Sequence, residues 1–198
     1  MDRYSSWRDH YCYPDSSVLI NRYNIRDSEQ LEAAERSVTA LTISHINLFQ
    51  PPFSLNTLST IHHTLFAELY SWAGDIRDIA ISKGNTRFCQ PMFIRREAEQ
   101  LFRKMENESW LSGLDHPEFC QRMAWYYGEL NILHPFREGN GRTLRILFEH
   151  IALHAGFRID WSELRIEDWL KANILAYEIG PEALNALFLQ HVFVLPET

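Results

Sequence analysis

Two amphipathic stretches joined by a very short connection constrain the fold of this chain more than any other feature. Residues 119–133 and the stretch from about Gly141 onward carry apolar side chains at the spacing of a helix. Pro135 cannot continue the first helix, because proline lacks the backbone N–H and clashes with the preceding turn. The sequence therefore predicts a helix that ends at His134, a tight loop over 136–140 and a second helix directly after it.

The start of the second helix carries residues suited to holding an anion. A helix N-terminus has unpaired N–H groups and the positive end of the helix dipole, and glycine lets an anion approach the backbone closely. Gly139, Asn140 and Gly141 occupy this position. Arg142 and Arg145 follow, three residues apart, so both guanidinium groups can reach the same anion. Two arginines indicate a ligand with more than one phosphate.

Glu138 and His134 complete a set of groups for phosphate chemistry. Mg²⁺ prefers oxygen ligands and usually takes one or two carboxylates together with phosphates and water, so Glu138 is the expected magnesium ligand. His134 is the expected general base, because an imidazole with an ordinary pKa of about 6.5 accepts a proton near neutral pH. The segment indicates phosphoryl or nucleotidyl transfer to a hydroxyl group of Ser, Thr or Tyr.

Each of these residues also has a structural explanation when it is read alone. A single His at a helix end is usually a cap or a packed polar residue, and Glu138 favours a helix N-terminus in any case. Arg145 has Glu149 four residues later as a candidate ion-pair partner. Phe136 is expected to anchor the loop in the core under either interpretation. Their coincidence in one short segment favours the chemical interpretation.

The segment His134–Arg145 resembles the signature of the Fic proteins, His-x-Phe-x-(Asp/Glu)-Gly-Asn-Gly-Arg-x-x-Arg, and agrees with it at every specified position. Residues 65–77 are similar to the helix and turn that precede the Fic flap, and residues 81–88 are similar to the flap itself. The resemblance implies an all-α Fic fold, a helical bundle with a small β-hairpin flap at about 80–88. We expect a single domain over residues 1–198.

Fic enzymes typically transfer AMP from ATP to a hydroxyl side chain of a target protein and release pyrophosphate. The resemblance therefore implies a protein adenylyltransferase that uses ATP as its substrate. His134 would activate the target hydroxyl, and Glu138 would hold Mg²⁺. The glycine–asparagine–glycine turn would surround the transferred α-phosphate, and the two signature arginines would hold the β- and γ-phosphates.

The tip of the flap has two interpretations. By resemblance, Lys83, Gly84, Asn85 and Thr86 would align the target segment by strand-like backbone pairing and cover the nucleotide. The same residues also form an ordinary hairpin turn, because Gly and Asn tolerate positive φ.

Three further residues bear on the nucleotide. Trp169 and Asn173 lie on a late helix that comes near the adenine in related proteins, although core packing and surface solvation are the more common roles for such residues. The Doc-type kinases of the same superfamily have Lys at the position of Gly141. A bulky side chain there would obstruct the triphosphate site, so Gly141 favours AMP transfer.

The inhibitory motif of many Fic proteins is missing from this chain. That motif, (Ser/Thr)-x-x-x-Glu-(Gly/Asn), lies on a helix whose Glu pairs with the second signature arginine. Here Glu precedes Gly or Asn only at Glu106 and Glu138, and Phe102 and His134 stand four residues before them. The resemblance then implies a small separate antitoxin that supplies the helix. Residues 11–25 also resemble stand-alone bacterial toxins of this class, whose relatives modify DNA gyrase and topoisomerase IV, so type II topoisomerase ATPase subunits are the expected targets.

Hydrophobic periodicity predicts helices along most of the remaining chain. They are expected at residues 28–49, 55–70 and 95–105 and, as two helices, at 166–194. Short β character is confined mainly to residues 78–88. The chain therefore reads as an all-α domain with one small hairpin.

Composition argues against several classes of partner. The net charge is −7 and the basic residues are scattered, which disfavours direct nucleic-acid binding. Cys12, Cys89 and Cys120 form neither a C-x-x-C pair nor a disulfide framework, which favours a reducing cytoplasm. No apolar run reaches the roughly 18–20 residues of a membrane span, and residues 1–13 lack the apolar core of a signal peptide, so no membrane partner is expected. No histidine spacing indicates a zinc site.

Two other functions stay open. The same fold could carry out a related transfer, such as phosphorylation or phosphocholination, because the signature fixes the phosphate and leaves the rest of the donor to the pocket. A catalytically inactive helical binding module is the other alternative, and the presence of His134, Glu138 and both arginines argues against it.

Overall fold

The computed structural model describes residues 9–196. The predicted single domain over 1–198 and the predicted absence of a signal peptide over 1–13 also involve residues 1–8 or 197–198, which lie outside the described residues. The helices are α1 (Ser28–Thr42), η1 (Ile43–His45), α2 (Leu55–Phe66), α3 (Pro91–Asn107), η2 (Ser109–Leu111), α4 (His116–Leu133), α5 (Asn140–His154), α6 (Ile166–Glu178) and α7 (Glu182–His191). The strands are β1 (Ser82–Lys83), β2 (Thr86–Arg87), β3 (Phe157–Ile159) and β4 (Val192–Val194). The prediction of a mainly helical fold with a small hairpin is confirmed.

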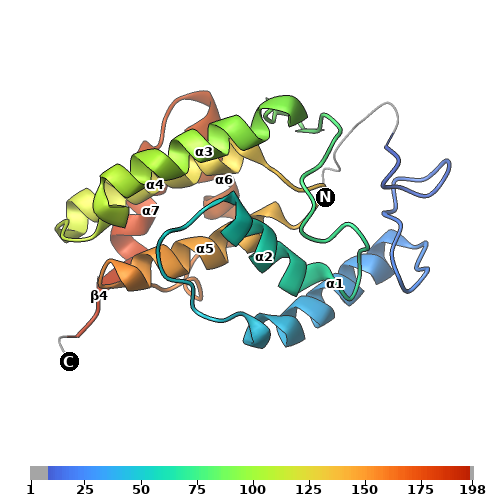
Figure 1. Ribbon diagram of the computed structural model, residues 1–198, viewed down its shortest axis with the longest axis horizontal. Helices are drawn as coiled ribbons and strands as arrows, with labels where there is room; N and C mark the ends of the chain where they lie inside the picture. Colours follow the sequence, from blue (N-terminus) through green and yellow to red (C-terminus); the bar gives the residue numbers. More distant parts are fainter. Residues whose placement is uncertain (1–8, 197–198) are drawn as a thin grey trace.

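The two helices that flank the signature loop lie at the centre of the bundle. Helix α4 packs against α3, α5, α6 and α7, while α5 packs against α2, and α2 in turn packs against α1. In Figure 1, α3 and α4 lie along the top of the view, α5 lies below them, and α1 and α2 lie together at the lower right. Their buried faces form one apolar core, in which Phe66, Phe119, Phe136, Phe148 and Phe188 are almost fully shielded from solvent. The loop over 134–139, which precedes α5, is therefore anchored in this core by Phe136 and flanked by α4 and α5.

Local caps explain where the helices near the loop begin. The Asp27 carboxylate accepts hydrogen bonds from the Glu29 and Gln30 backbone N–H groups in the first turn of α1, and the Asp115 carboxylate accepts one from the Glu118 N–H in the first turn of α4. Ser54 and Thr57 form a reciprocal capping box at the start of α2. Pro91 occupies the first turn of α3, where its missing N–H costs no helical hydrogen bond.

Several predicted helix boundaries are wrong. The helix predicted over 28–49 ends at Thr42 and continues only as the short η1, and the one predicted over 55–70 ends at Phe66. The segment 39–43 is rich in β-branched residues, which lose side-chain freedom in a helix. Conversely, α3 extends beyond the predicted 95–105 at both ends.

Sequence reasoning also missed a second small sheet. The predicted hairpin is present as β1 paired antiparallel with β2, with Ser82 opposite Arg87. In addition, β3 pairs antiparallel with β4, and Phe157 lies opposite Val194. The last helix therefore ends at His191, and the Val-Phe-Val run after it forms a strand, as β-branched and aromatic residues favour. Within residues 9–196, no helix is both long enough and apolar enough to span a membrane.

Candidate active site

His134 caps the C-terminal end of α4, as the sequence predicts. Its backbone is left-handed, with φ 43°, and its side chain is buried. Nδ1 lies 2.8 Å from the Asn131 carbonyl oxygen, and because a carbonyl only accepts, the ring proton of the neutral imidazole is on Nδ1. Nε2 then carries the lone pair that a base needs. Burial lowers the pKa of His134 to about 3, so the ring is neutral at physiological pH.

The loop between the two helices is closed by the side chain of Asn140. Its Oδ1 accepts a hydrogen bond of 2.8 Å from the Phe136 N–H, and its Nδ2 donates one of 2.8 Å to the Phe136 carbonyl. Both backbone groups of Phe136 are thus satisfied by one buried amide. The Asn140 side chain shapes the loop, so any contact of Asn140 with a phosphate would come from its backbone N–H.

The N-terminus of α5 has the geometry of an anion site. Gly139 is its N-cap, with φ 80°, and the first helical hydrogen bond runs from the Thr143 N–H to the Gly139 carbonyl. The N–H groups of Asn140, Gly141 and Arg142 precede that bond and have no partner within the helix. A Cβ at Gly141 would meet nothing within 4 Å, so the space beside this backbone is open.

Glu138, the predicted magnesium ligand, lies next to this N-terminus, and its surroundings are compatible with a bound cation. Its Oε1 accepts a hydrogen bond of 2.8 Å from the Gly139 N–H. Burial, and then the neighbouring charge of Glu35, raises the pKa of the Glu138 carboxyl, which a bound cation would counteract. Within residues 9–196 no cluster of three or more His, Cys, Asp or Glu side chains could hold a metal. A single carboxylate suits Mg²⁺ that is otherwise held by phosphates and water.

His62 supports the loop from α2 and was missed as a site residue, because the adjacent histidines were considered only for zinc. Its Nε2 donates to the Glu138 carbonyl at 2.9 Å, and its Nδ1 accepts from the Gly74 N–H at 2.8 Å. The ring stacks on Phe136 with centroids 4.0 Å apart. The available signal was a histidine on the apolar face of a predicted helix, where a buried polar group needs partners.

Arg77 is a second missed residue, and it holds the end of α4. This guanidinium is buried and donates hydrogen bonds to four backbone carbonyls. The distances are 2.7 Å to His134, 3.2 Å to Leu133, and 2.6 Å to both Ile79 and Cys89. The backbone N–H of Arg77 also donates a hydrogen bond to the Pro135 carbonyl. A positive charge at a helix C-terminus is favourable, so Arg77 fixes the backbone that carries the base. 

The N-terminal segment also contacts the signature loop. Arg137, between Phe136 and Glu138 in the chain, forms a buried ion pair with Asp9, and its Nε lies 2.8 Å from the Asp9 carboxylate. This pair joins positions 128 residues apart. It ties the start of the described chain to the loop that bears the predicted magnesium ligand.

The two signature arginines differ in their surroundings. The Arg142 guanidinium forms an ion pair with Glu35 of α1 and lies 4.6 Å from the centre of the Phe66 ring. Arg145, one turn later, makes no ion pair within residues 9–196, so the alternative pairing with Glu149 is not present. Arg145 is half-buried on the same face of α5 as Arg142.

The hairpin is anchored beside His134. Its tip consists of Lys83, Gly84, Asn85 and Thr86, where Gly84 has φ 55° and the first three residues are exposed. Phe88 follows β2, and its ring stacks on the His134 imidazole with centroids 3.7 Å apart. The charge of Lys83 contributes, after burial and the Arg77 charge, to the lowered pKa of His134. The predicted flap therefore lies next to the predicted base.

Trp169 and Asn173 occupy different surroundings on α6. Trp169 packs edge-on against Tyr127, with centroids 5.0 Å apart, and against Trp161 and Phe188. Asn173 accepts a hydrogen bond of 3.0 Å from the side chain of Asn131, whose backbone carbonyl holds His134. The structure thus brings Asn173 near the end of α4, whereas Trp169 belongs to an aromatic cluster.

Comparison with known proteins agrees with this geometry. The Fic/DOC family model matches residues 52–152. The chain is 38% identical to the probable protein adenylyltransferase Fic of Salmonella typhimurium, over 100% of this chain and 98% of that protein. It is 40% identical to the probable protein adenylyltransferase Fic of Escherichia coli, over 87% and 86%.

Solved structures agree as well. The N-terminal Fic domain of a cell filamentation protein from Bartonella quintana superposes with a TM-score of 0.84 at 29% identity, over 93% of this chain and 92% of that one. BepC of Bartonella tribocorum, determined with bound AMPPNP, gives 0.85 at 26% identity, over 94% and 97%. The chain therefore belongs to the Fic/DOC family.

Proposed function

We propose that this protein is an adenylyltransferase that transfers AMP from ATP to a hydroxyl side chain of a target protein. The observation that carries the proposal is the placement of a neutral His134, with its lone pair on Nε2, at the end of α4, one short loop before the open N-terminus of α5. The names of the related proteins from Salmonella typhimurium and Escherichia coli support the same chemistry.

In the proposed reaction the oxygen of the target hydroxyl attacks the α-phosphorus of ATP. The bond between the α-phosphorus and the oxygen that bridges to the β-phosphate breaks, and pyrophosphate leaves. His134 Nε2 takes the proton of the hydroxyl. The backbone N–H groups of Asn140, Gly141 and Arg142 stabilise the charge on the α-phosphate. The negative charge of a bound triphosphate would raise the pKa of His134 from about 3 toward the range of an effective base.

Glu138 would hold the magnesium ion at this site. Mg²⁺ would neutralise part of the phosphate charge and orient the leaving pyrophosphate. We assign Arg145 to the terminal phosphates; in support, its half-buried side chain lies on the same face of α5 as Arg142 and makes no ion pair within residues 9–196. The open space beside Gly141 supports the orientation of ATP that leads to AMP transfer.

We further propose that the protein acts in the cytoplasm as the toxin of a toxin–antitoxin pair. Its antitoxin would supply a helix with the (Ser/Thr)-x-x-x-Glu-(Gly/Asn) motif, and its targets would be the ATPase subunits of DNA gyrase and topoisomerase IV. The proposal draws on the absence of this motif from the sequence. It is tested by adding a peptide of that motif to the transfer reaction, which should inhibit labelling, whereas a peptide with Ala in place of Glu should not.

The decisive experiment uses ATP labelled separately on the α- and γ-phosphates. The purified protein, its His134→Ala variant and a His45→Ala control are incubated with magnesium, the nucleotide and purified gyrase and topoisomerase IV. His45 is an exposed histidine on η1, so its loss should leave transfer unchanged. We expect α-label on a target protein with the wild type and the control, and none with His134→Ala, which should still bind ATP.

The other outcomes are distinct. Label from the γ-phosphate would mean that the protein is a kinase, and a transferred phosphocholine from a labelled cytidine diphosphate donor would mean phosphocholine transfer. Absence of nucleotide binding by the wild type would favour the inactive binding module. If His134→Ala transferred AMP at the normal rate, His134 would not be the base.

A further inference from the structure

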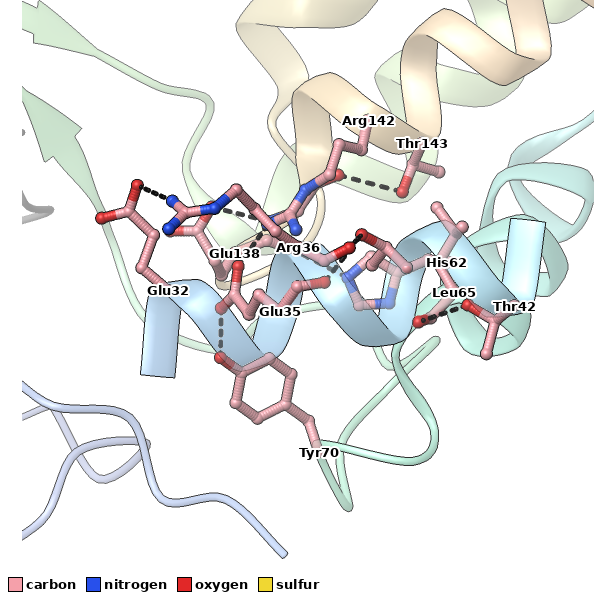
Figure 2. Close-up of polar contacts among 12 residues, drawn as sticks. Glu32, Glu35, Arg36, Thr42, His62, Leu65, Tyr70, Glu138, Arg142 and Thr143 are labelled. Carbon is pink, nitrogen blue, oxygen red and sulfur yellow. Dashed lines mark hydrogen bonds and ion pairs between the residues drawn. The ribbon is translucent and has the colours of Figure 1, made fainter. Parts of the chain in front are cut away.

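Glu35 connects a helix outside the signature to the first signature arginine. It lies in the middle of α1, is buried, and its two carboxylate oxygens have different partners. Oε1 accepts a hydrogen bond from the Tyr70 hydroxyl, and Oε2 pairs with the Arg142 guanidinium. Figure 2 shows the carboxylate between these two groups. Burial, and then Glu35 itself, raises the pKa of Tyr70, so the hydroxyl keeps its proton and remains a donor.

The Arg142 guanidinium is held from a second direction by Phe66. The ring centre lies 4.6 Å from the central carbon of the guanidinium, at a distance typical of a cation–π contact. The same ring excludes a side chain at Gly139, because an added Cβ would lie 2.4 Å from it. Phe66 is fully buried, so it is a fixed surface against which both the loop glycine and the arginine rest. The orientation of the guanidinium is therefore set by the Phe66 ring against its face and by the Glu35 carboxylate at its edge.

The pair with Glu35 leaves other donors of Arg142 available. A guanidinium has five N–H groups in a planar fork, and the contact with Glu35 Oε2 uses one terminal nitrogen. The Arg142 side chain is 27% exposed, whereas that of Glu35 is 11% exposed. If a nucleotide drew Arg142 away, Glu35 would be left as a buried charge without its cation, which is strongly unfavourable. Arg142 can instead stay on Glu35 and offer its remaining N–H groups to a phosphate.

We propose that Glu35 is a positioning residue for nucleotide binding, which holds the Arg142 guanidinium on the Phe66 ring so that its remaining N–H groups meet a phosphate of ATP. Tyr70 fixes the Glu35 carboxylate in this orientation. The inference rests on the proposed AMP transfer and adds a residue of α1 to the nucleotide site.

A positioning glutamate and an inhibitory glutamate have opposite effects on nucleotide affinity. Glu35 is followed by Arg36 and preceded at the fourth position by Leu31, so it does not fit the inhibitory motif, and it pairs with the first signature arginine. An inhibitory glutamate competes with a phosphate, so its removal tightens nucleotide binding. A positioning glutamate preorganises the donor, so its removal weakens binding.

The test measures the Kd for AMPPNP with magnesium and the rate of AMP transfer from α-labelled ATP. Glu35→Ala should weaken AMPPNP binding about tenfold, which corresponds to about 1.4 kcal/mol. Glu35→Gln should stay within about threefold of the wild type, because the amide can accept from Arg142 and donate to the Tyr70 oxygen. Tyr70→Phe is the alternative variant if Glu35→Ala does not fold. It keeps the ring that stacks on Trp72, with centroids 4.5 Å apart, and removes only the hydroxyl. It should weaken AMPPNP binding by about threefold.

Glu32→Ala is the matched control. Glu32 lies on α1 one turn before Glu35 and pairs with Arg36 at 2.6 Å on the exposed side, as Figure 2 shows. Its loss should leave the Kd within about twofold of the wild type, as surface ion pairs contribute little. In a double-mutant cycle, Glu35→Ala should cause no further loss of affinity once Arg142 is Ala, since Glu35 acts through that guanidinium.

Three results would overturn the inference alone, and a fourth would overturn it together with the proposed function. Unchanged affinity in Glu35→Ala and Tyr70→Phe would remove the positioning role, and tighter binding would make Glu35 inhibitory. An undiminished loss in the Arg142→Ala background would make the effect of Glu35 purely structural. If the wild type itself bound no AMPPNP, the proposed function would fail together with the inference, whereas a wild type that binds and transfers normally confines the failure to Glu35.

Discussion

The Phe88 ring and the His134 imidazole lie face to face, with centroids 3.7 Å apart and planes inclined by 15°. Phe88 directly follows β2, and His134 ends α4, so the stack joins the hairpin to the helix that presents the proposed base. The ring also covers one face of the imidazole and contributes to the burial that lowers the pKa of His134 to about 3. The position of the hairpin and the basicity of His134 are therefore coupled.

Replacement of Phe88 by Ala should raise the pKa of His134 toward 6.5, because water would reach the ring and solvate its charged form. A base is inactive when it is protonated, so the acid limb of the profile of kcat/KM against pH should move to higher pH than in the wild type. Rates between about pH 3 and pH 8, together with an NMR titration of the imidazole, measure the shift. Phe193→Ala, on the partly exposed β4, is the control and should leave the limb in place. An unmoved acid limb in Phe88→Ala would mean that the stack does not shield the base.

Substitution of Gly139 by Ala should be far more damaging than the same change at Gly113. Both glycines have nearly the same positive φ, 80° and 79°, so alanine meets a similar left-handed penalty at each, about 1–2 kcal/mol. Only at Gly139 would the new Cβ lie 2.4 Å from Phe66, whereas at Gly113 it meets nothing within 4 Å. We expect Gly139→Ala to lose roughly 1–3 kcal/mol more in the free energy of unfolding, as overpacking typically costs. Urea unfolding of the two variants measures the difference, and equal losses would contradict the clash.

The signature segment could be predicted from the sequence because its determinants are local. Pro135 and the glycines around Asn140 fix where α4 ends and α5 begins, and the spacing within the segment places His134 and Glu138 on either side of the same loop. The helical class of the fold followed from periodicity for the same reason. The boundaries of α1 and α2 were less accurate, since helix ends depend on tertiary contacts such as that of the Thr42 hydroxyl with the Leu65 carbonyl.

The groups that support the signature could not be predicted in the same way. Glu35 reaches Arg142 across 107 residues, and Arg77 reaches the His134 carbonyl across 57. His62 and Arg77 bind backbone carbonyls, which every residue possesses, so no sequence pattern identifies their partners. The pairing of β3 with β4 was missed for a similar reason, because each strand is only three residues long.

Loss of the Arg77 guanidinium should destabilise the whole site. In Arg77→Met the carbonyls of Leu133, His134, Ile79 and Cys89 would lose a buried charged donor, and such bonds contribute about 1.5–3 kcal/mol each. We expect the free energy of unfolding to fall by at least about 3 kcal/mol. Arg87→Met, an exposed arginine on β2, is the control and should change it by no more than about 0.5 kcal/mol. Chemical denaturation of both variants decides whether Arg77 holds the end of α4, and equal stabilities would refute this role.

The pH dependence of stability should report the burial of His62. Burial lowers the pKa of His62 to about 3, and its two hydrogen bonds, to the Glu138 carbonyl and from the Gly74 N–H, hold the neutral ring. The unfolded chain binds a proton at this histidine below about pH 6.5, and the folded chain does not until about pH 3. The unfolded state therefore binds more protons in this window, so stability falls as the pH falls, by about 2 kcal/mol between pH 8 and pH 5 for this residue.

A His62→Gln variant isolates this contribution, because glutamine can make both hydrogen bonds but does not titrate. The variant should be less stable than the wild type at pH 8 and should lose about 2 kcal/mol less between pH 8 and pH 5. His134 contributes in the same direction as His62, and Glu138, whose pKa is raised, contributes in the opposite direction, but both stay in the variant and cancel in the comparison. Urea unfolding at the two pH values measures the slopes, with the exposed His45→Gln as the control that should keep the wild-type slope. If His62→Gln kept that slope as well, His62 would titrate alike in the folded and unfolded chains, and its neutral form would not be what supports the loop.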